Sequence, residues 1–280
     1  MQDVSDRKTS SVETSVREFY DTYGWVEVDG ASGEDRSFRV FRPAYESYHR
    51  AVERRTQAVF QPFGDSLLIA GCGDMPDSHV RLARNYPEIA CADISARALD
   101  RAREKLGPPA ELLEASILEL PVAENRFDAV FCAHVIYHID IDLQEKAIAE
   151  LIRVTKPGGR VVVIASNPQS PFRYVAAVAL RLQKMVGGSA SSKNPSPEAA
   201  SDKPALYFAR HPLKWWRRFE DRCDVEMQPW DAIGSLEEQA MLPGDRLASG
   251  FYRFAAWFER TAPGLAARFW QYPIVILTKR

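Results

Sequence analysis

The chain has 280 residues, of which 46% are hydrophobic and 26% charged, and its formal net charge is -2. This composition is typical of a soluble globular protein that forms one large domain, or one domain with an insertion, and the near balance of charge gives no electrostatic signature of nucleic-acid binding. Met1–Ser15 lacks a signal-peptide core, no run approaches the ~20 apolar residues of a membrane span, and the four cysteines are scattered, so we expect a cytoplasmic protein with reduced thiols.

The N-terminal part of the chain predicts helices after a polar tail of about 12 residues. Apolar spacing favours a short helix over Val12–Tyr23 and a long helix from Pro43 to Phe60, with an extended segment at Arg36–Arg42 between them.

Strand and helix patterns alternate regularly from Ser66 to Ala165. The predicted strands are Leu67–Ala70, Glu88–Ala92, Glu111–Glu114, Asp128–Ala133 and Arg160–Ala165. The predicted helices are Asp77–Asn85, a helix that is capped by Ser95 and ends at Leu106, and Leu143–Val154. Strands separated by helices imply right-handed crossovers and a parallel sheet.

The pattern changes after Ala165. Helices are predicted at Pro171–Leu182, Pro212–Phe219 and over most of Arg246–Trp270, strands at Asp224–Trp230 and Tyr272–Thr278, and a low-complexity loop at Gly187–Pro204.

The first predicted strand runs directly into Gly71-Cys72-Gly73, and Asp93 ends the next strand 20 residues later. Glycines at a strand-to-helix turn let backbone N–H groups approach a ligand, and an acid on the neighbouring strand accepts hydrogen bonds from both hydroxyls of a ribose. This pairing predicts a site for a nucleoside cofactor.

Five segments in order give residues 63–165 a family resemblance: Leu67–Gly73, Ala92–Ser95, Leu118–Pro121, Arg126–Val130 and Leu151–Gly159. They resemble the motifs of class I S-adenosylmethionine (SAM)-dependent methyltransferases of the small-molecule type. The resemblance implies an α/β, Rossmann-like fold with a seven-stranded, mostly parallel sheet and helices on both faces. It also implies a tail and helical lid at 1–62, and a SAM-dependent methyltransferase domain at 63–280 with a cap insertion at about 170–220 and a helical segment at about 246–270.

The same resemblance assigns a SAM site. Its residues are Tyr23, Ala70, Gly71, Cys72, Gly73, Asp93, Ile94, Ser116, Ile117, Ala133 and His134. Asp93 is expected to hold the ribose hydroxyls, and Ile94 to pack against adenine. Three positions depart from the family pattern: Ile69 and Ser116 replace acids, and Met75 replaces a third glycine.

His134 and His138 follow the fourth predicted strand, at the sheet edge where ligands bind in open α/β folds. One interpretation makes either histidine a general base for a hydroxyl acceptor; the alternatives are that His134 lines the cofactor pocket and that His138 packs a turn. A metal cluster of His134 and His138 with Asp140 and Asp142 is a further alternative, but helix capping explains the acids, and we expect no metal.

Ala133–Ile136, at the end of the fourth strand, lack the Asn/Asp-Pro-Pro-aromatic motif that is typical of enzymes that methylate base nitrogens. Methylation of cytosine C5 needs a nucleophilic cysteine after a proline, and Cys132 does not follow a proline. We therefore expect a small organic acceptor rather than nucleic acid, with a hydroxyl slightly favoured over an amine or a carbon. Many aromatic side chains outside the motifs suit an apolar or aromatic acceptor.

Two other functions stay open at this point: a nicotinamide-dependent oxidoreductase on the same sheet, and a non-catalytic SAM-binding or interaction module. The sequence does not indicate an oligomeric state.

Overall fold

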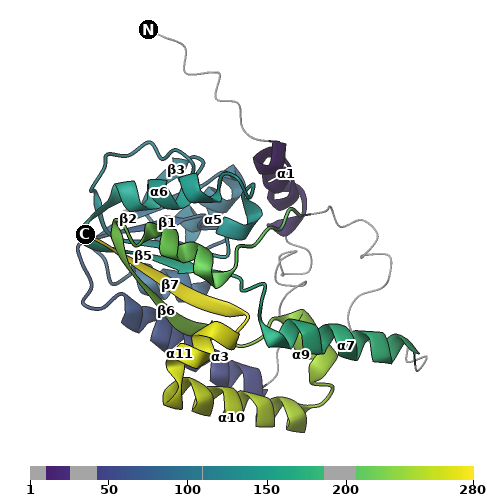
Figure 1. Cartoon of the computed structure of the whole chain (residues 1–280). Helices are drawn as coiled ribbons and strands as arrows, with labels where there is room; N and C mark the ends of the chain where they lie inside the picture. The colour runs from purple at the N-terminus through teal and green to yellow at the C-terminus, as the bar shows by residue number, and fades with distance from the viewer. Residues whose placement is uncertain (1–10, 26–42, 109, 186–205) are drawn as a thin grey trace.

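The computed structural model describes residues 11–25, 43–108, 110–185 and 206–280, and these residues form a seven-stranded sheet (Figure 1). The strand order is β3-β2-β1-β4-β5-β7-β6. The strands are β1 (Ser66–Ala70), β2 (Glu88–Asp93), β3 (Ala110–Glu114), β4 (Phe127–Ala133), β5 (Thr155–Ile164), β6 (Cys223–Asp231) and β7 (Tyr272–Lys279). β7 runs antiparallel to both of its neighbours, β5 and β6, and all other pairs of strands are parallel. The predicted Rossmann-like, mostly parallel sheet is confirmed.

The helical elements are arranged on both faces of the sheet and beyond one end of it (Figure 1). They are α1 (Ser11–Phe19), η1 (Tyr20–Gly24), α3 (Pro43–Val59), α4 (Asp77–Ala83), α5 (Ala96–Leu106), η2 (Ile136–His138), α6 (Gln144–Val154), α7 (Pro171–Met185), η3 (Leu213–Phe219), α9 (Ser235–Met241), α10 (Asp245–Thr261) and α11 (Pro263–Phe269). No helix in the described part of the chain is both long and apolar enough to span a membrane.

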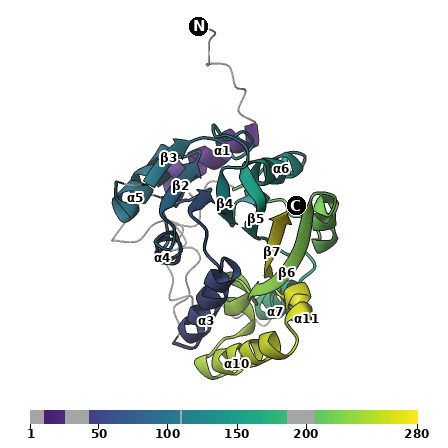
Figure 2. The same cartoon turned by 90° about the vertical axis from the view of Figure 1, so that its left-hand side faces the viewer.

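Alternation along the strands divides the core into two layers. In β1, Leu68 and Ala70 face α6 and η3, whereas Leu67 and Ile69 face α4, α5 and the end of α3. Side chains of a strand point alternately to opposite faces, so a fully apolar strand such as β1 needs a helical layer on each side. Figure 2 shows α6 on one side of the sheet and α3 and α4 on the other.

A third apolar cluster joins α3 to α9, α10 and α11 beside β6. Within it the buried carboxylate of Glu259 accepts hydrogen bonds from the Tyr48 hydroxyl and from Trp270 Nε1, and it pairs with Arg55. A buried carboxylate needs such partners, because an unpaired charge is costly to remove from water. The division of the chain at residue 62 and the bounds of the cap stay predictions.

Several elements differ in detail from the sequence prediction. The predicted helix Arg246–Trp270 breaks at Ala262 into α10 and α11, because Pro263 cannot donate its backbone N–H and so begins a new helix. Helix α9 was not predicted, and the segment Leu213–Phe219 is a 3₁₀ helix whose aromatic side chains pack on the sheet. Ser95 caps α5 as predicted, since its Oγ accepts a hydrogen bond from Ala98 N at 3.2 Å. The predicted polar tail as far as residue 10, the extended segment Arg36–Arg42 and the loop Gly187–Pro204 lie outside the described residues.

Candidate active site

The loop after β1 has the backbone geometry that its glycines permit. Gly71 and Gly73 have φ values of +68° and +54°, in the left-handed region that residues with a Cβ avoid. A Cβ built on Gly71 would lie 2.3 Å from Val135 Cγ2, so the position also lacks room for a side chain. Met75, which replaces the family's third glycine, keeps a positive φ of 52° with its side chain fully buried. The loop thus keeps the shape of a glycine-rich turn although one glycine is missing.

Asp93 at the end of β2 joins this loop to the next helix. Its Oδ2 accepts a hydrogen bond from Gly73 N, and its Oδ1 accepts one from Ser95 N, each at 2.9 Å. Burial raises the pKa of Asp93, and the backbone N–H donors oppose that rise. A carboxylate has about four lone-pair sites, so Asp93 can still accept hydrogen bonds from a ligand. The structure therefore brings together the glycine loop and the acid that the sequence singled out.

The other predicted cofactor residues lie around this loop with different degrees of exposure. Ala70 and Cys72 are buried, so they present backbone rather than side chain to the loop surface. Ile94 is half-buried, while Ile117 packs in the core layer beneath α6. Ser116 Oγ accepts a hydrogen bond from Leu118 N at 3.1 Å and so shapes the turn after β3. Contacts of Ile94, Ser116 and Ile117 with adenine stay predictions.

The segment η1 and the residue after it cover the glycine loop. A Cβ built on Gly73 would lie 2.9 Å from Trp25 Cζ2, so the indole ring rests directly on this glycine. Tyr20 stacks on Trp25 with ring centroids 4.9 Å apart. Asp21 accepts hydrogen bonds from Ser95 Oγ and, through its backbone carbonyl, from Arg97. Tyr23, a predicted cofactor residue, packs its ring against Phe19 at 5.4 Å.

His134 follows β4 in a strained conformation, with φ +63°. Its Nδ1 lies 2.7 Å from the Tyr137 hydroxyl, and its ring contacts Trp230 and Tyr272 at centroid distances of 4.8 and 5.4 Å. Burial, followed by the nearby His79 and His138, lowers the pKa of His134 to about 3. Non-glycine residues with positive φ are uncommon and cluster at functional sites, so the backbone marks His134 independently of its chemistry.

His138 is also a neutral imidazole at physiological pH. Burial lowers its pKa to about 4. Its Nδ1 lies 2.8 Å from the Tyr207 carbonyl oxygen; a carbonyl only accepts, so Nδ1 carries the proton. Tyr20 packs edge-on against the His138 ring at 6.3 Å, which joins the histidines to the segment over the glycine loop. Both histidines therefore lie at the predicted edge of the sheet, and both are weak bases.

The model of the family described as "Methyltransferase domain" matches residues 68–163, the part that contains β1, Asp93 and His134. This stretch of the chain is similar to a methyltransferase domain. This match favours methyl transfer over the nicotinamide alternative.

Curated relatives of the methyltransferase domain include two that are named for quinone biosynthesis. A demethylmenaquinone methyltransferase of Clavibacter sepedonicus is 31% identical over 163 residues, which cover 54% of this chain and 65% of that protein. A ubiquinone/menaquinone biosynthesis C-methyltransferase of Erwinia tasmaniensis is 33% identical over 108 residues, which cover 36% of this chain and 42% of that protein. The similarity thus spans less than two thirds of either relative.

Solved structures share the fold of the methyltransferase domain over nearly the whole chain. The N-methyltransferase NodS of Bradyrhizobium japonicum, in complex with S-adenosylhomocysteine (SAH), aligns with a TM-score of 0.55 at 13% identity, covering 95% of this chain and 98% of its own. The geranyl diphosphate C-methyltransferase of Streptomyces coelicolor aligns with a TM-score of 0.55 at 15% identity, covering 98% of this chain and 100% of its own. At such identities the likeness shows the fold alone.

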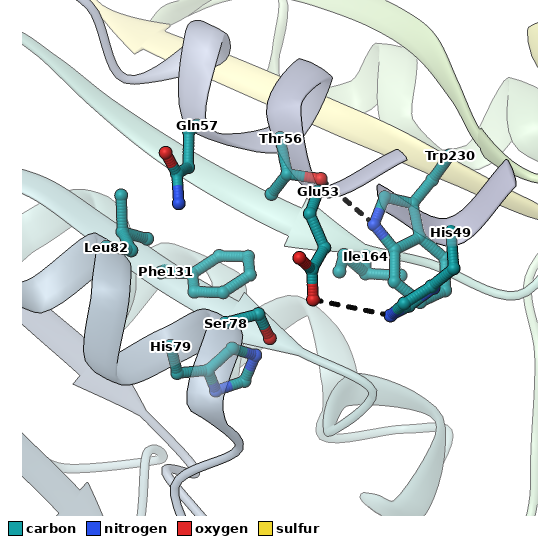
Figure 3. Close-up of a pocket in the computed structure, with 10 residues that line it drawn as sticks. All are labelled: His49, Glu53, Thr56, Gln57, Ser78, His79, Leu82, Phe131, Ile164 and Trp230. Carbon is teal, nitrogen blue, oxygen red and sulfur yellow. Dashed lines mark hydrogen bonds and ion pairs between the residues drawn. The ribbon is translucent and has the colours of Figure 1, made fainter. Parts of the chain in front are cut away.

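A small cavity separates α3 from α4 beside the methyltransferase site (Figure 3). Its volume of about 40 Å³ suits water rather than an organic acceptor. Trp230 lines it and donates its Nε1–H to Thr56 Oγ1 at 3.1 Å, while the same indole ring contacts His134. His79 also lines the cavity, and burial lowers its pKa to about 4. No group of three His, Cys, Asp or Glu side chains within the described ranges is placed to hold a metal ion.

Sequence reasoning missed several residues that surround His134 and His138. Trp230 is the second-last residue of β6 and Tyr272 begins the antiparallel β7, so both lie at the edge of the sheet where β4 ends. Phe208 stacks on Tyr137 at 4.3 Å, and the Tyr207 carbonyl binds His138. The sequence does show that Trp230 and Tyr272 lie at strand ends. That position predicts their contact with His134 only when the strand order is known.

Proposed function

We propose that the protein transfers a methyl group from SAM to a small organic acceptor. The observation that carries this proposal is the cradle formed by the left-handed Gly71 and Gly73 with Asp93, inside a segment that matches the methyltransferase family. The residues fit the cofactor: the glycines leave no Cβ over the loop, and Asp93 keeps acceptor capacity for a ribose. SAM would supply a methyl group bound to a sulfonium sulfur, and the thioether of SAH would leave without activation by the protein.

The acceptor atom that we propose is a carbon that is nucleophilic without help from a strong base, as in the ring of a hydroquinone. The S–CH3 bond of SAM breaks as the new C–CH3 bond forms, and the methylated ring then loses its proton to water, for which a weak base is sufficient. His134 and His138, with pKa values of about 3 and 4, are too weak as bases to deprotonate an aliphatic alcohol. The surrounding rings of Tyr137, Trp230 and Tyr272 suit a planar acceptor. The relatives named for C-methylation and quinone biosynthesis support carbon, and the initial preference for a hydroxyl acceptor gains no support from them.

Turnover with matched acceptors tests this proposal. We expect SAH to form when the full chain is incubated with SAM and a reduced naphthoquinol, and not with a saturated alcohol of similar size. Mass spectrometry of both products identifies the methylated atom. Methylation of oxygen in preference to carbon would contradict the proposed acceptor, and SAM binding without turnover on any acceptor of a broad panel would favour the non-catalytic alternative.

The pH dependence of turnover shows whether His134 acts as a general base or only as a neutral ring that lines the site. Because the pKa of His134 lies near 3, the imidazole is already deprotonated throughout the range from about pH 5.5 to pH 8, and we expect no step in log kcat that depends on it. The measurement is a pH–rate profile of the wild type and of His134→Gln. We expect the two profiles to be parallel. A step near pH 6.5 in the wild type that is absent from the variant would restore His134 as the general base.

We further propose that the N-terminal segment is a lid over the cofactor. The support is the Trp25 ring on Gly73 and the Asp21 contacts with Ser95 and Arg97. A lid slows both entry and exit of a ligand, so Trp25→Ala is expected to raise the association and dissociation rates of SAH together, with a smaller change in Kd. Stopped-flow measurements with a fluorescent SAH analogue give both rates. A slower association in the variant would contradict this role.

Cytoplasmic location and the absence of a nucleic-acid partner stay predictions.

A further inference from the structure

Two arginines lie half-buried beside the acceptor end of the site without a carboxylate partner. Arg210 follows Phe208, and Arg173 lies in the first turn of α7. Among the residues that the structure describes, no acid forms an ion pair with either guanidinium group. A charged side chain that is partly removed from water without an opposite charge carries a desolvation cost.

Arg210 is held by one hydrogen bond and by one aromatic ring. Its Nε donates a hydrogen bond to Ser166 Oγ at 2.9 Å, just beyond the carboxyl end of β5. Its guanidinium lies 3.7 Å from the centroid of the Phe208 ring. Phe208 stacks in turn on Tyr137, whose hydroxyl is 2.7 Å from His134 Nδ1. Ser166 uses only Nε, so the two terminal nitrogens of Arg210 have no acceptor within the described ranges.

The electrostatic environment of Arg210 is unfavourable as it stands. Burial and then the positive charge of Arg173 lower the pKa of Arg210 to about 10. Tyr272, Tyr137 and Glu237 act in the opposite direction, but Glu237 does not reach ion-pair distance. Two like charges that repel each other in a poorly solvated place are stabilised when an anion binds between them.

We propose that Arg210 and Arg173 bind an anionic group, a carboxylate or a phosphate, on the methyl acceptor. The planar guanidinium presents its nitrogens as a fork that matches the oxygens of either group. The inference rests on the proposed function, since it names a chemical class for the acceptor of the same site. Because Arg210 is linked through Phe208 and Tyr137 to His134, the anion would anchor an acceptor whose reacting ring lies among Tyr137, Trp230 and Tyr272.

The test uses binding, so that it does not depend on knowing the acceptor. The full chain saturated with SAH is titrated with inorganic diphosphate, with benzoate, and with phenol as the neutral control, using isothermal titration calorimetry. We expect at least one anion to bind more tightly than phenol. Binding of benzoate points to an acceptor acid, and binding of diphosphate points to a phosphorylated acceptor.

Variants assign that binding to the two arginines. Arg210→Gln and Arg173→Gln are each expected to weaken anion binding by about tenfold or more, the loss of a charge-assisted hydrogen bond. Arg181→Gln is the matched control, because Arg181 is exposed on the same helix as Arg173, and it should leave binding unchanged. Arg210→Lys keeps the positive charge but lacks the planar guanidinium, so it should retain part of the affinity for the anion.

Failure of this inference and failure of the proposed function give different results. If SAH binds but neither anion does, or if the anion binds equally well to the two glutamine variants and the wild type, the inference is wrong and the proposed function is untouched. If SAH itself does not bind to the wild type, the proposed function fails. Thermal unfolding of each variant shows whether it is folded, and Arg173→Gln gives an independent answer if Arg210→Gln is not.

Discussion

Replacing Asp93 with alanine is expected to weaken SAH binding by about 10- to 100-fold, which corresponds to ~1.5–3 kcal/mol for hydrogen bonds to a charged group. The reason is twofold. The variant removes the carboxylate proposed to hold the ribose hydroxyls, and it removes the acceptor that fixes Gly73 N and Ser95 N at 2.9 Å. Calorimetric titration of SAH into wild type and variant measures the effect.

The matched control for this prediction is Asp100→Ala. Asp100 is an exposed acid on α5 whose only described ion pair is with its helix neighbour Arg103, so its removal should leave SAH affinity unchanged. Asp93→Asn keeps the size of the side chain and one acceptor oxygen, and should lie between wild type and Asp93→Ala. An affinity for SAH in Asp93→Ala equal to that of wild type would remove Asp93 from the cofactor site.

Replacing Gly71 with alanine should have the largest effect on folding. The backbone at φ +68° costs ~1–2 kcal/mol with a Cβ present, and the clash of that Cβ with Val135 adds ~1–3 kcal/mol of overpacking. We therefore expect the free energy of unfolding to fall by ~2–5 kcal/mol, together with a loss of SAH binding. Denaturant unfolding monitored by circular dichroism measures the first effect.

Two comparisons separate backbone strain from steric clash. Gly107→Ala changes a glycine with φ +81° that has nothing within 4 Å of the added Cβ, so it should show strain alone. The double variant Gly71→Ala/Val135→Ala removes the methyl groups that the new Cβ meets, and it should recover part of the stability lost in Gly71→Ala once the cost of Val135→Ala alone is subtracted. If the double variant recovers none of the stability lost in Gly71→Ala, the predicted clash with Val135 does not occur.

Local patterns were sufficient for the central part of the fold. The apolar runs of β1, β2 and β4, the cap at Ser95 and the glycines after β1 each report a conformation set within a few residues of sequence. The proximity of Asp93 to the glycine loop was predicted for the same reason, since Asp93 ends the strand next to the one that carries the glycines. The C-terminal helices were predicted less well: short, amphipathic helices such as α9 and α11 depend on packing against α10 and β6 more than on their own propensity.

The sequence by itself determined that β1 to β5 are strands of a parallel sheet, and it identified the glycine loop and the acid that follows it, because strand periodicity and turn chemistry are properties of neighbouring residues. Only the tertiary structure placed Trp230, Tyr272 and Phe208 around the His134–Tyr137 pair, and Trp25 on Gly73. The positions of Trp230 and Tyr272 follow from the insertion of the antiparallel β7 between β5 and β6, because the end of β6 and the start of β7 then lie together at the edge where β4 ends. Such contacts join residues more than 40 positions apart in the sequence. They form because whole layers of side chains pack together, so no single segment of the sequence encodes them.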